Sequence, residues 1–196
     1  LATVIPPARA RGMKVYARHL EAFHEALHAR FPSFAKVRQV DVFGQTQPSP
    51  CWNHPEYRAF WHGYVRQVTS RYEIDGLLLG AERDASLEPM LHHGEAPRCF
   101  CRHCLAAART RNIDAGRARE GLAKLHRLVT TNEIPVDGLL TSILRVMLRH
   151  PEVLAWETFQ NDSKWSLYAD LRRTAKRQAP RLEVGWHLPM YPLNHD

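Results

Sequence analysis

The stretch Ile74-Asp-Gly-Leu-Leu-Leu-Gly-Ala-Glu82 decides the fold of this chain. Residues 74–80 form an almost continuous apolar run that ends just before Glu82. Such a run suits a parallel strand covered on both faces, because a strand with one exposed face alternates apolar and polar residues. We therefore predict a buried strand over residues 74–80, with Glu82 just beyond its carboxyl end.

The segments on either side of this run carry strand and helix patterns in turn. Short apolar or alternating stretches predict three further strands at residues 13–20 (MKVYARHL), 153–159 (VLAWETF) and 182–188 (LEVGWHL). Apolar residues at three- and four-residue steps predict helices at 55–72, 101–112, 114–149 with a break near Pro135, and 162–178. Residues 37–43 alternate apolar and polar side chains, which fits either a strand or an extended loop.

This alternation predicts an α/β fold of parallel β/α units with right-handed crossovers. An eight-stranded barrel takes about 250 residues, whereas this chain has 196 residues and does not begin with Met. We therefore expect a fragment, one partial (β/α)8 TIM-type barrel domain over residues 1–196. The alternative is a small doubly wound sheet. In both architectures ligands bind beyond the carboxyl ends of the strands.

The composition narrows the classes of partner. Hydrophobic residues make up 44% and charged residues 24% of the chain, which suits a folded domain rather than a disordered one. No run of 18 apolar residues occurs, so we expect no membrane span. The formal charge of +7 fits a polyanion partner or simply an Arg-rich surface. The densest basic cluster, residues 172–177, is typical of one solvated helix end, so we expect no nucleic acid.

The four cysteines predict a metal site. Cys99, Cys101 and Cys104 form C-x-C-x-x-C, and Cys51 precedes the helix predicted over residues 55–72. Four thiolates satisfy tetrahedral zinc and leave no open position for water, so the ion would be structural. Disulfides and unligated thiols are the alternatives, although a disulfide within C-x-C is strained.

Charged neighbours accompany these cysteines. Arg98 and Arg102 flank the trio and can offset the negative charge of a four-thiolate zinc site. His103 can replace a ligand or support one from outside.

The order of these motifs resembles a known family. The pieces are Cys51-Trp-Asn-His-Pro-Glu-Tyr-Arg58, Gly80-Ala-Glu82 and Cys99-Phe-Cys-Arg-His-Cys104. Together they resemble the β-galactosidases of glycoside hydrolase family 42, and also uncharacterised bacterial barrel proteins classed as glycosyl hydrolases. The resemblance covers residues 13–105, and beyond them only the order of elements matches.

The resemblance implies a role for each piece. In that family four cysteines hold a structural zinc beside the barrel, and the Glu that ends strand four is the acid/base, which corresponds to Glu82. Residues 13–20 and 74–82 would be strands three and four, and residues 153–159 and 182–188 strands five and six. The nucleophile, a Glu that ends strand seven, would lie outside this chain. Ala81 departs from the family, which has an Asn there that contacts the sugar.

Several polar and aromatic residues lie at the carboxyl ends of the predicted strands. Besides Glu82, these are the candidate substrate-binding residues Arg83, Glu157, Trp186 and His187, together with His19. Cleavage of a glycosidic bond needs two carboxyl groups across the sugar, about 5–5.5 Å apart for retention and 6.5–9.5 Å for inversion. The alternative for each residue is a structural pair or a core position. Asp75 lies at the opposite, amino end of its strand, where we expect a structural role.

The sequence therefore predicts a glycoside hydrolase barrel that acts on a carbohydrate, with Glu82 as acid/base and zinc as a structural ion. One alternative is a non-catalytic or degenerate carbohydrate-binding barrel. Another is a zinc-stapled interaction module that binds anions through its basic surface. Because an incomplete barrel exposes sheet edges, a homo-oligomer is also possible.

Overall fold

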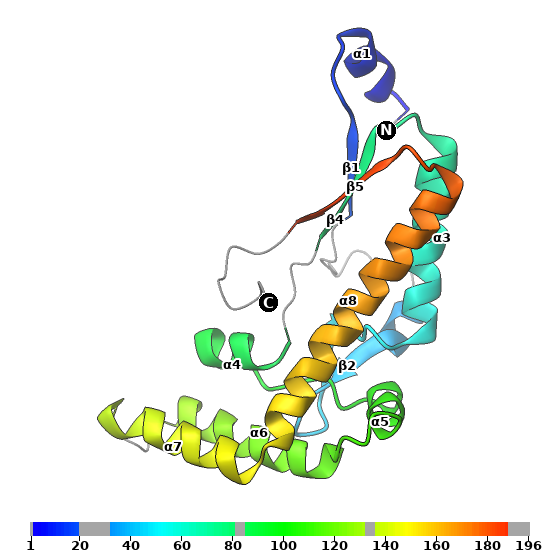
Figure 1. Cartoon of the computed structure of the whole chain (residues 1–196). Helices are drawn as coiled ribbons and strands as arrows, with labels where there is room; N and C mark the ends of the chain where they lie inside the picture. Colours follow the sequence, from blue (N-terminus) through cyan, green and yellow to red (C-terminus); the bar gives the residue numbers. More distant parts are fainter. Residues whose placement is uncertain (1, 20–31, 81–84, 132–135, 188–196) are drawn as a thin grey trace. The chain divides into compact units, whose positions relative to one another are not determined.

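The computed structural model describes residues 2–19, 32–80, 85–131 and 136–187 (Figure 1). These residues group into two compact units. The first unit comprises residues 2–19, 55–80 and 164–187, and the second comprises residues 32–54, 85–131 and 136–163.

The first unit is a short succession of strands and helices. Its elements are α1 (Ile5–Ala10), β1 (Tyr16–His19), α3 (Pro55–Arg71), β4 (Gly76–Gly80), the later part of α8 (Glu152–Gln178) and β5 (Glu183–His187). The three strands form one parallel sheet in the order β1-β4-β5. The strands predicted at 13–20, 74–80 and 182–188 are therefore confirmed, as is the α/β class.

The central strand is β4, as its apolar sequence predicts. It pairs with β1 on one edge and β5 on the other, and of its side chains Leu77 and Leu79 on one face are fully buried while Leu78 on the other is half-buried. Tyr16 on β1 lies opposite Gly76, and Glu183 on β5 lies opposite the same residue. A Cβ atom added at Gly76 would overlap the ring of Tyr16, so the sheet needs a glycine at this position.

Asp75 links all three strands at their amino ends. Its carboxylate accepts a hydrogen bond of 2.8 Å from the backbone N–H of Val15, and its own N–H donates to the Val15 carbonyl at 2.8 Å. The backbone N–H of Glu183 donates to the Asp75 carbonyl at 3.0 Å. The structural role expected for Asp75 agrees with these bonds.

The helices α3 and α8 contribute parallel segments to this unit. Arg58 forms an ion pair with Asp170 at 2.6 Å, and His62 lies 2.8 Å from the hydroxyl of Thr174. The buried face of α3 carries Tyr57, Trp61, Val65 and Val68. That face has the spacing that predicted the helix.

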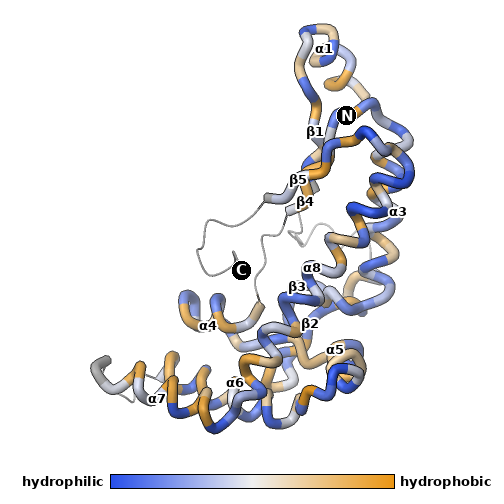
Figure 2. The backbone as a smooth tube through the Cα atoms, in the orientation of Figure 1, coloured by the Kyte–Doolittle hydropathy of each residue, from blue (hydrophilic) through white to orange (hydrophobic). Residues whose placement is uncertain are grey.

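The second unit combines a hairpin with a group of helices. Its elements are the 3₁₀ helix η1 (Pro32–Val37), the antiparallel strands β2 (Arg38–Val40) and β3 (Thr46–Pro50), α4 (Leu87–His93), α5 (Arg102–Arg109), α6 (Ala115–Thr130), α7 (Val136–Arg149) and the first part of α8. Figure 2 shows apolar and polar residues in turn along α6 and α7, which is the pattern of amphipathic helices. The core includes Phe100 and Trp156, whose rings stack with centroids 4.5 Å apart.

The strand predicted at residues 153–159 is wrong, because these residues lie in α8. Val153, Trp156 and Phe159 are buried and Leu154 is exposed, so burial follows a helical period rather than alternation. β5 pairs directly with β4 as a result. Of the four strands that the resemblance implied, the described residues thus form the three at residues 13–20, 74–80 and 182–188.

Both parts of the second unit follow a strand of the first unit in the sequence. Residues 23–54 come between β1 and α3, and residues 84–163 follow β4. The second unit is thus built from two insertions, each placed after the carboxyl end of a parallel strand. The described residues form a three-stranded sheet and a hairpin, and the closed barrel is not formed by them.

Candidate functional site

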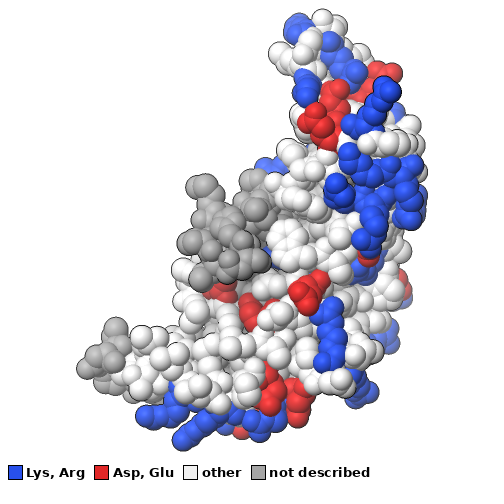
Figure 3. Space-filling model, in the orientation of Figure 1, with Lys and Arg blue, Asp and Glu red and all other residues white. Residues whose placement is uncertain are grey.

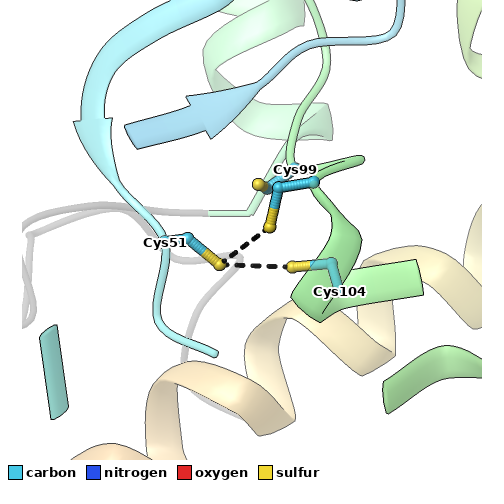
Figure 4. Close-up of side chains that lie close together, drawn as sticks. Cys51, Cys99 and Cys104 are labelled. Atoms are coloured by element: carbon cyan, nitrogen blue, oxygen red, sulfur yellow. Dashed lines mark hydrogen bonds between the residues drawn. The ribbon is translucent and has the colours of Figure 1, made fainter. Parts of the chain in front are cut away.

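The four cysteines come together in the second unit. Their sulfur atoms all lie within 4.8 Å of one another, and all four side chains are buried. The Sγ atom of Cys51 lies 3.4 Å from those of Cys104 and Cys101. Figure 4 shows the sulfurs of Cys51 and Cys104 directed at each other.

This geometry fits a single four-coordinate metal ion. Zinc–sulfur bonds of about 2.3 Å in a tetrahedron place the sulfurs about 3.8 Å apart. The sulfur separations here, from 3.4 Å up to 4.8 Å, bracket that value. None of the four cysteines forms a disulfide. The cluster can hold a metal ion, as the sequence predicted.

Local backbone pairing brings the two cysteine segments together. The N–H of Phe100 donates to the Val40 carbonyl at 2.7 Å, and the N–H of Val42 donates to the Pro97 carbonyl at 2.7 Å. These bonds hold the segment that carries Cys99 against β2. Cys51 follows β3 directly, so the β2–β3 hairpin carries it to the same place.

The short helix α5 orients the remaining two cysteines. Cys101 is the N-cap residue of α5, and Cys104 lies in its first turn. Two cysteines at this spacing lie on one side of a helix start, so both sulfurs can reach one ion.

Backbone and side-chain N–H groups point at the sulfurs. The backbone N–H of Val40 donates to Cys99 Sγ at 3.4 Å, and that of Asn53 donates to Cys51 Sγ at 3.3 Å. The Asn53 amide Nδ2 donates to Cys104 Sγ at 3.4 Å and to Ser163 Oγ at 3.0 Å. Such donors stabilise thiolate charge and fix ligand orientation. Sequence reasoning missed this role of Asn53, although its position two residues after Cys51 was the available signal.

The protonation of the cluster also favours a cation. Hydrogen bonds from the other thiols, that of Cys104 first, lower the pKa of Cys101 well below its ordinary value. Burial raises the pKa of Cys99, and the hydrogen bond to Cys101 raises that of Cys51. Four buried sulfurs cannot all ionise without a positive charge among them, and a metal ion supplies that charge.

Two of the charged neighbours have contacts of their own. Arg98 pairs with Glu95, so its guanidinium has a carboxylate partner of its own. His103 lies outside the set of four groups that can share an ion. Its ring packs edge-on against that of His54, with centroids 4.4 Å apart.

The catalytic candidate Glu82 and the substrate candidate Arg83 lie outside the described residues. The strand that leads to them is described, and its last residue, Gly80, lies opposite His187 on β5. His19 on β1 and Trp186 on β5 both lie opposite Leu79. The three strands therefore end at the same edge, as expected for parallel strands, with His19, Trp186 and His187 on it.

Among the residues at this edge, Trp186 has a side chain that the structure describes and that a ligand can reach. It is 38% exposed and packs edge-on against Trp165 and Tyr168, with centroids 6.0 and 5.6 Å away. The hydroxyl of Tyr168 donates to the carbonyl of Gly80. This packing fixes the orientation of the indole.

Glu157 has a different position from the one predicted. It lies within α8, so it does not end a strand. Its Oε2 atom accepts hydrogen bonds from the backbone N–H groups of Ser86 at 3.0 Å and Leu87 at 3.2 Å. These are the first N–H groups of α4, which need an acceptor because a helix start leaves them without one. Glu157 therefore supports α4.

One group of basic side chains lies over α3 and the later part of α8, both in the first unit (Figure 3). Exposed residues of this surface include Arg66, Arg71, Arg172, Arg173 and Arg177. Asp170 lies among them and pairs with Arg58 and Arg173. In the part of the chain that is described, none of the helices has the length and apolarity needed to cross a bilayer.

No family model matches this sequence, and no curated protein matches it. Among solved structures, alpha-L-fucosidase isoenzyme 2 from Paenibacillus thiaminolyticus has a similar fold, with a TM-score of 0.50 and 15% sequence identity. The similarity covers 93% of this chain and 22% of the fucosidase, so the chain spans about a fifth of that protein. The comparison shows that this chain has an α/β fold in common with part of a glycoside hydrolase.

Proposed function

We propose that this chain is part of the catalytic barrel of a retaining glycoside hydrolase, with Glu82 as acid/base and a structural zinc ion on the four cysteines. The observation that carries the proposal is the place of Glu82 in the chain. It follows by two residues the buried central strand of a parallel sheet, at the strand end where β/α folds bind their ligands. The fold shared with a fucosidase supports the same class of enzyme.

The residues of this chain would act on a sugar as follows. Glu82 would protonate the leaving-group oxygen and then deprotonate the attacking water. Trp186 would offer its exposed indole face to the sugar ring, while Arg83 and His187 would donate hydrogen bonds to sugar hydroxyls. The nucleophile would come from a part of the protein outside this chain. Zinc would hold the loops after β1 and β4 without touching the substrate, because four thiolates leave no open position.

The test is turnover of a panel of aryl glycosides, including α-L-fucosides and β-galactosides, by the complete gene product. Glu82→Gln should reduce kcat by about 10²- to 10⁴-fold, the usual contribution of a general acid/base. The loss should be smaller for an activated leaving group such as dinitrophenol, which needs little protonation. A merely structural defect would not depend on the leaving group.

Glu73→Gln is the matched control. Glu73 precedes β4, at the other end of the strand, and its side chain is 87% exposed, so kcat should not change. Equal activity in the wild type and in Glu82→Gln would remove Glu82 from the mechanism.

A non-catalytic or degenerate carbohydrate-binding barrel is the second candidate. The presence of Ala81, where the family that the sequence resembles has an Asn that contacts the sugar, favours it. Saturable sugar binding without turnover on any glycoside of the panel, with equal affinity in Glu82→Gln, would establish this second candidate.

A further inference from the structure

A pocket of about 320 Å³ lies in the second unit beside the cysteine cluster. Its polar lining consists of Lys36, Arg38, Thr46, His54, Arg102 and His103, and Cys101 also reaches it. We call these residues the cationic pocket. None of the lining residues is acidic, although the chain contains 20 acidic residues. The volume lies at the lower end of the range typical of small-molecule sites.

Two of its cations are available to a ligand. Lys36 and Arg102 are both exposed, and neither forms an ion pair with a carboxylate in the described part of the chain. Arg102 instead donates through Nε to the ring of His103 at 3.2 Å. This hydrogen bond uses Nε and not the two terminal nitrogens, and a guanidinium presents its nitrogens as a fork that matches an oxyanion.

A helix start adds backbone donors to the same wall. Cys101 is the N-cap of α5, and Arg102 and His103 are the first two helical residues. In this first turn the N–H of Cys104 bonds to the Cys101 thiol, while those of Arg102 and His103 have no intrahelical acceptor, and the helix dipole adds partial positive charge there. Cationic side chains and a helix start therefore converge on one cavity.

The metal cluster lies mostly outside the lining of the pocket. Four thiolates with one divalent ion carry two negative charges, but Cys51, Cys99 and Cys104 are fully buried, and Cys101 is the one cysteine among the lining residues. A ligand in the pocket would therefore meet Lys36 and Arg102 before it met most of the cluster.

We propose that the cationic pocket binds a small oxyanion group, phosphate or sulfate, either free or carried on a sugar. Lys36 and Arg102 supply charge and directed donors, Thr46 supplies a hydroxyl, and the start of α5 supplies the backbone N–H groups of Arg102 and His103. The pocket belongs to the second unit, so this inference does not depend on Glu82 or on glycoside hydrolysis.

The experiment is calorimetric titration of the complete, metal-loaded protein at low ionic strength. The probes are inorganic phosphate, inorganic sulfate, a hexose 6-phosphate, a hexose 6-sulfate and the neutral hexose, with potassium chloride as the control for ionic strength. Arg102→Gln and Lys36→Gln should each raise the dissociation constant for the anions about tenfold. Arg109→Gln is the matched control, because Arg109 lies in the last turn of the same helix.

The outcomes separate the two sources of the anion. Tighter binding of a hexose phosphate or sulfate than of the inorganic ion would identify a sugar-borne group, and equal binding a free anion. No saturable binding by the wild type, or equal weakening by Arg109→Gln, would overturn the proposal.

The metal content of each variant is measured in parallel, because Arg102 adjoins two cysteines. If Arg102→Gln loses the metal, Lys36→Gln decides, since Lys36 lies on η1, away from the cysteines in sequence. Unchanged anion affinity in a metal-loaded Lys36→Gln protein would show that the cations serve only to balance the cluster.

Discussion

Replacement of Cys51 by Ser should abolish stoichiometric metal binding and most of the stability that the metal confers. Cys51 Sγ lies 3.4 Å from two of the other sulfurs, and Cys51 is the cysteine of the cluster that the first insertion supplies. Loss of a mere hydrogen-bond partner of a ligand costs about 10- to 100-fold in metal affinity. Loss of the ligand itself should therefore cost more than 100-fold.

The effect on stability follows from linkage. A metal present at about 1,000 times its dissociation constant stabilises the folded state by about 4.1 kcal/mol. For proteins of this size, each kcal/mol corresponds to about 2–4 °C in Tm. The gap in Tm between metal-loaded and chelator-treated protein should then be about 8–16 °C in the wild type, and it should nearly vanish in Cys51→Ser.

The assay pairs elemental analysis with thermal unfolding before and after chelation. The chain has no cysteine outside the cluster, so the control is Ala108→Ser, which places a hydroxyl in the same fully buried core without removing a ligand. That variant should keep one metal per chain and the full gap in Tm. If the wild type binds no metal, or if Cys51→Ser keeps both the metal and the gap, the four-ligand site is refuted.

Three further predictions concern packing, pH and helix capping. Gly121→Ala should lower the free energy of unfolding by about 1–3 kcal/mol because its Cβ would lie 2.7 Å from the Cβ of His150. Gly63 has open space around it, so Gly63→Ala should raise that free energy by up to about 1 kcal/mol. Denaturant titration of both variants checks this. The N–H of Val15 holds the pKa of Asp75 below its ordinary value of 3.8. This hydrogen bond therefore stabilises the fold above pH 3.8, and the stabilisation is lost as pH falls through the lowered pKa. Between pH 5 and 2 the free energy of unfolding should decline less in Asp75→Asn than in the wild type. Glu157→Ala should cost about 1–3 kcal/mol in denaturant titration because two N–H groups at the start of α4 lose their acceptor, and its KM for any glycoside should stay unchanged.

The parallel sheet could be predicted from the sequence because its central strand is a short apolar run. In the structure Leu77 and Leu79 are fully buried and Leu78 is half-buried, whereas β1 and β5 are mixed stretches that also contain charged residues. The strand β3 could not be predicted, since Thr-Gln-Pro-Ser-Pro contains two prolines, which disfavour strands. It forms because the hairpin places it against β2.

The segment at residues 153–159 shows how composition misled the prediction. Val, Trp, Thr and Phe favour strands, and their presence in one short stretch outweighed the spacing. Yet Val153, Trp156 and Phe159 recur at three-residue steps, the period of a helix face, and all three are buried. Spacing was the better guide here, because burial against the core of the second unit decided the secondary structure.

The cysteine cluster was predictable because three of its ligands are local in sequence, while the fourth depends on the arrangement of two loops. Cys51 belongs to the insertion after β1, and the other three cysteines belong to the insertion after β4. Loops at the carboxyl ends of parallel strands carry the ligand contacts of β/α folds. A metal that joins two such loops restricts the segments from which substrate contacts come, and closing long loops is where a crosslink gains most in chain entropy. The zinc would therefore serve function through loop positioning, so Cys51→Ser should raise KM for a glycoside even though no cysteine touches the substrate.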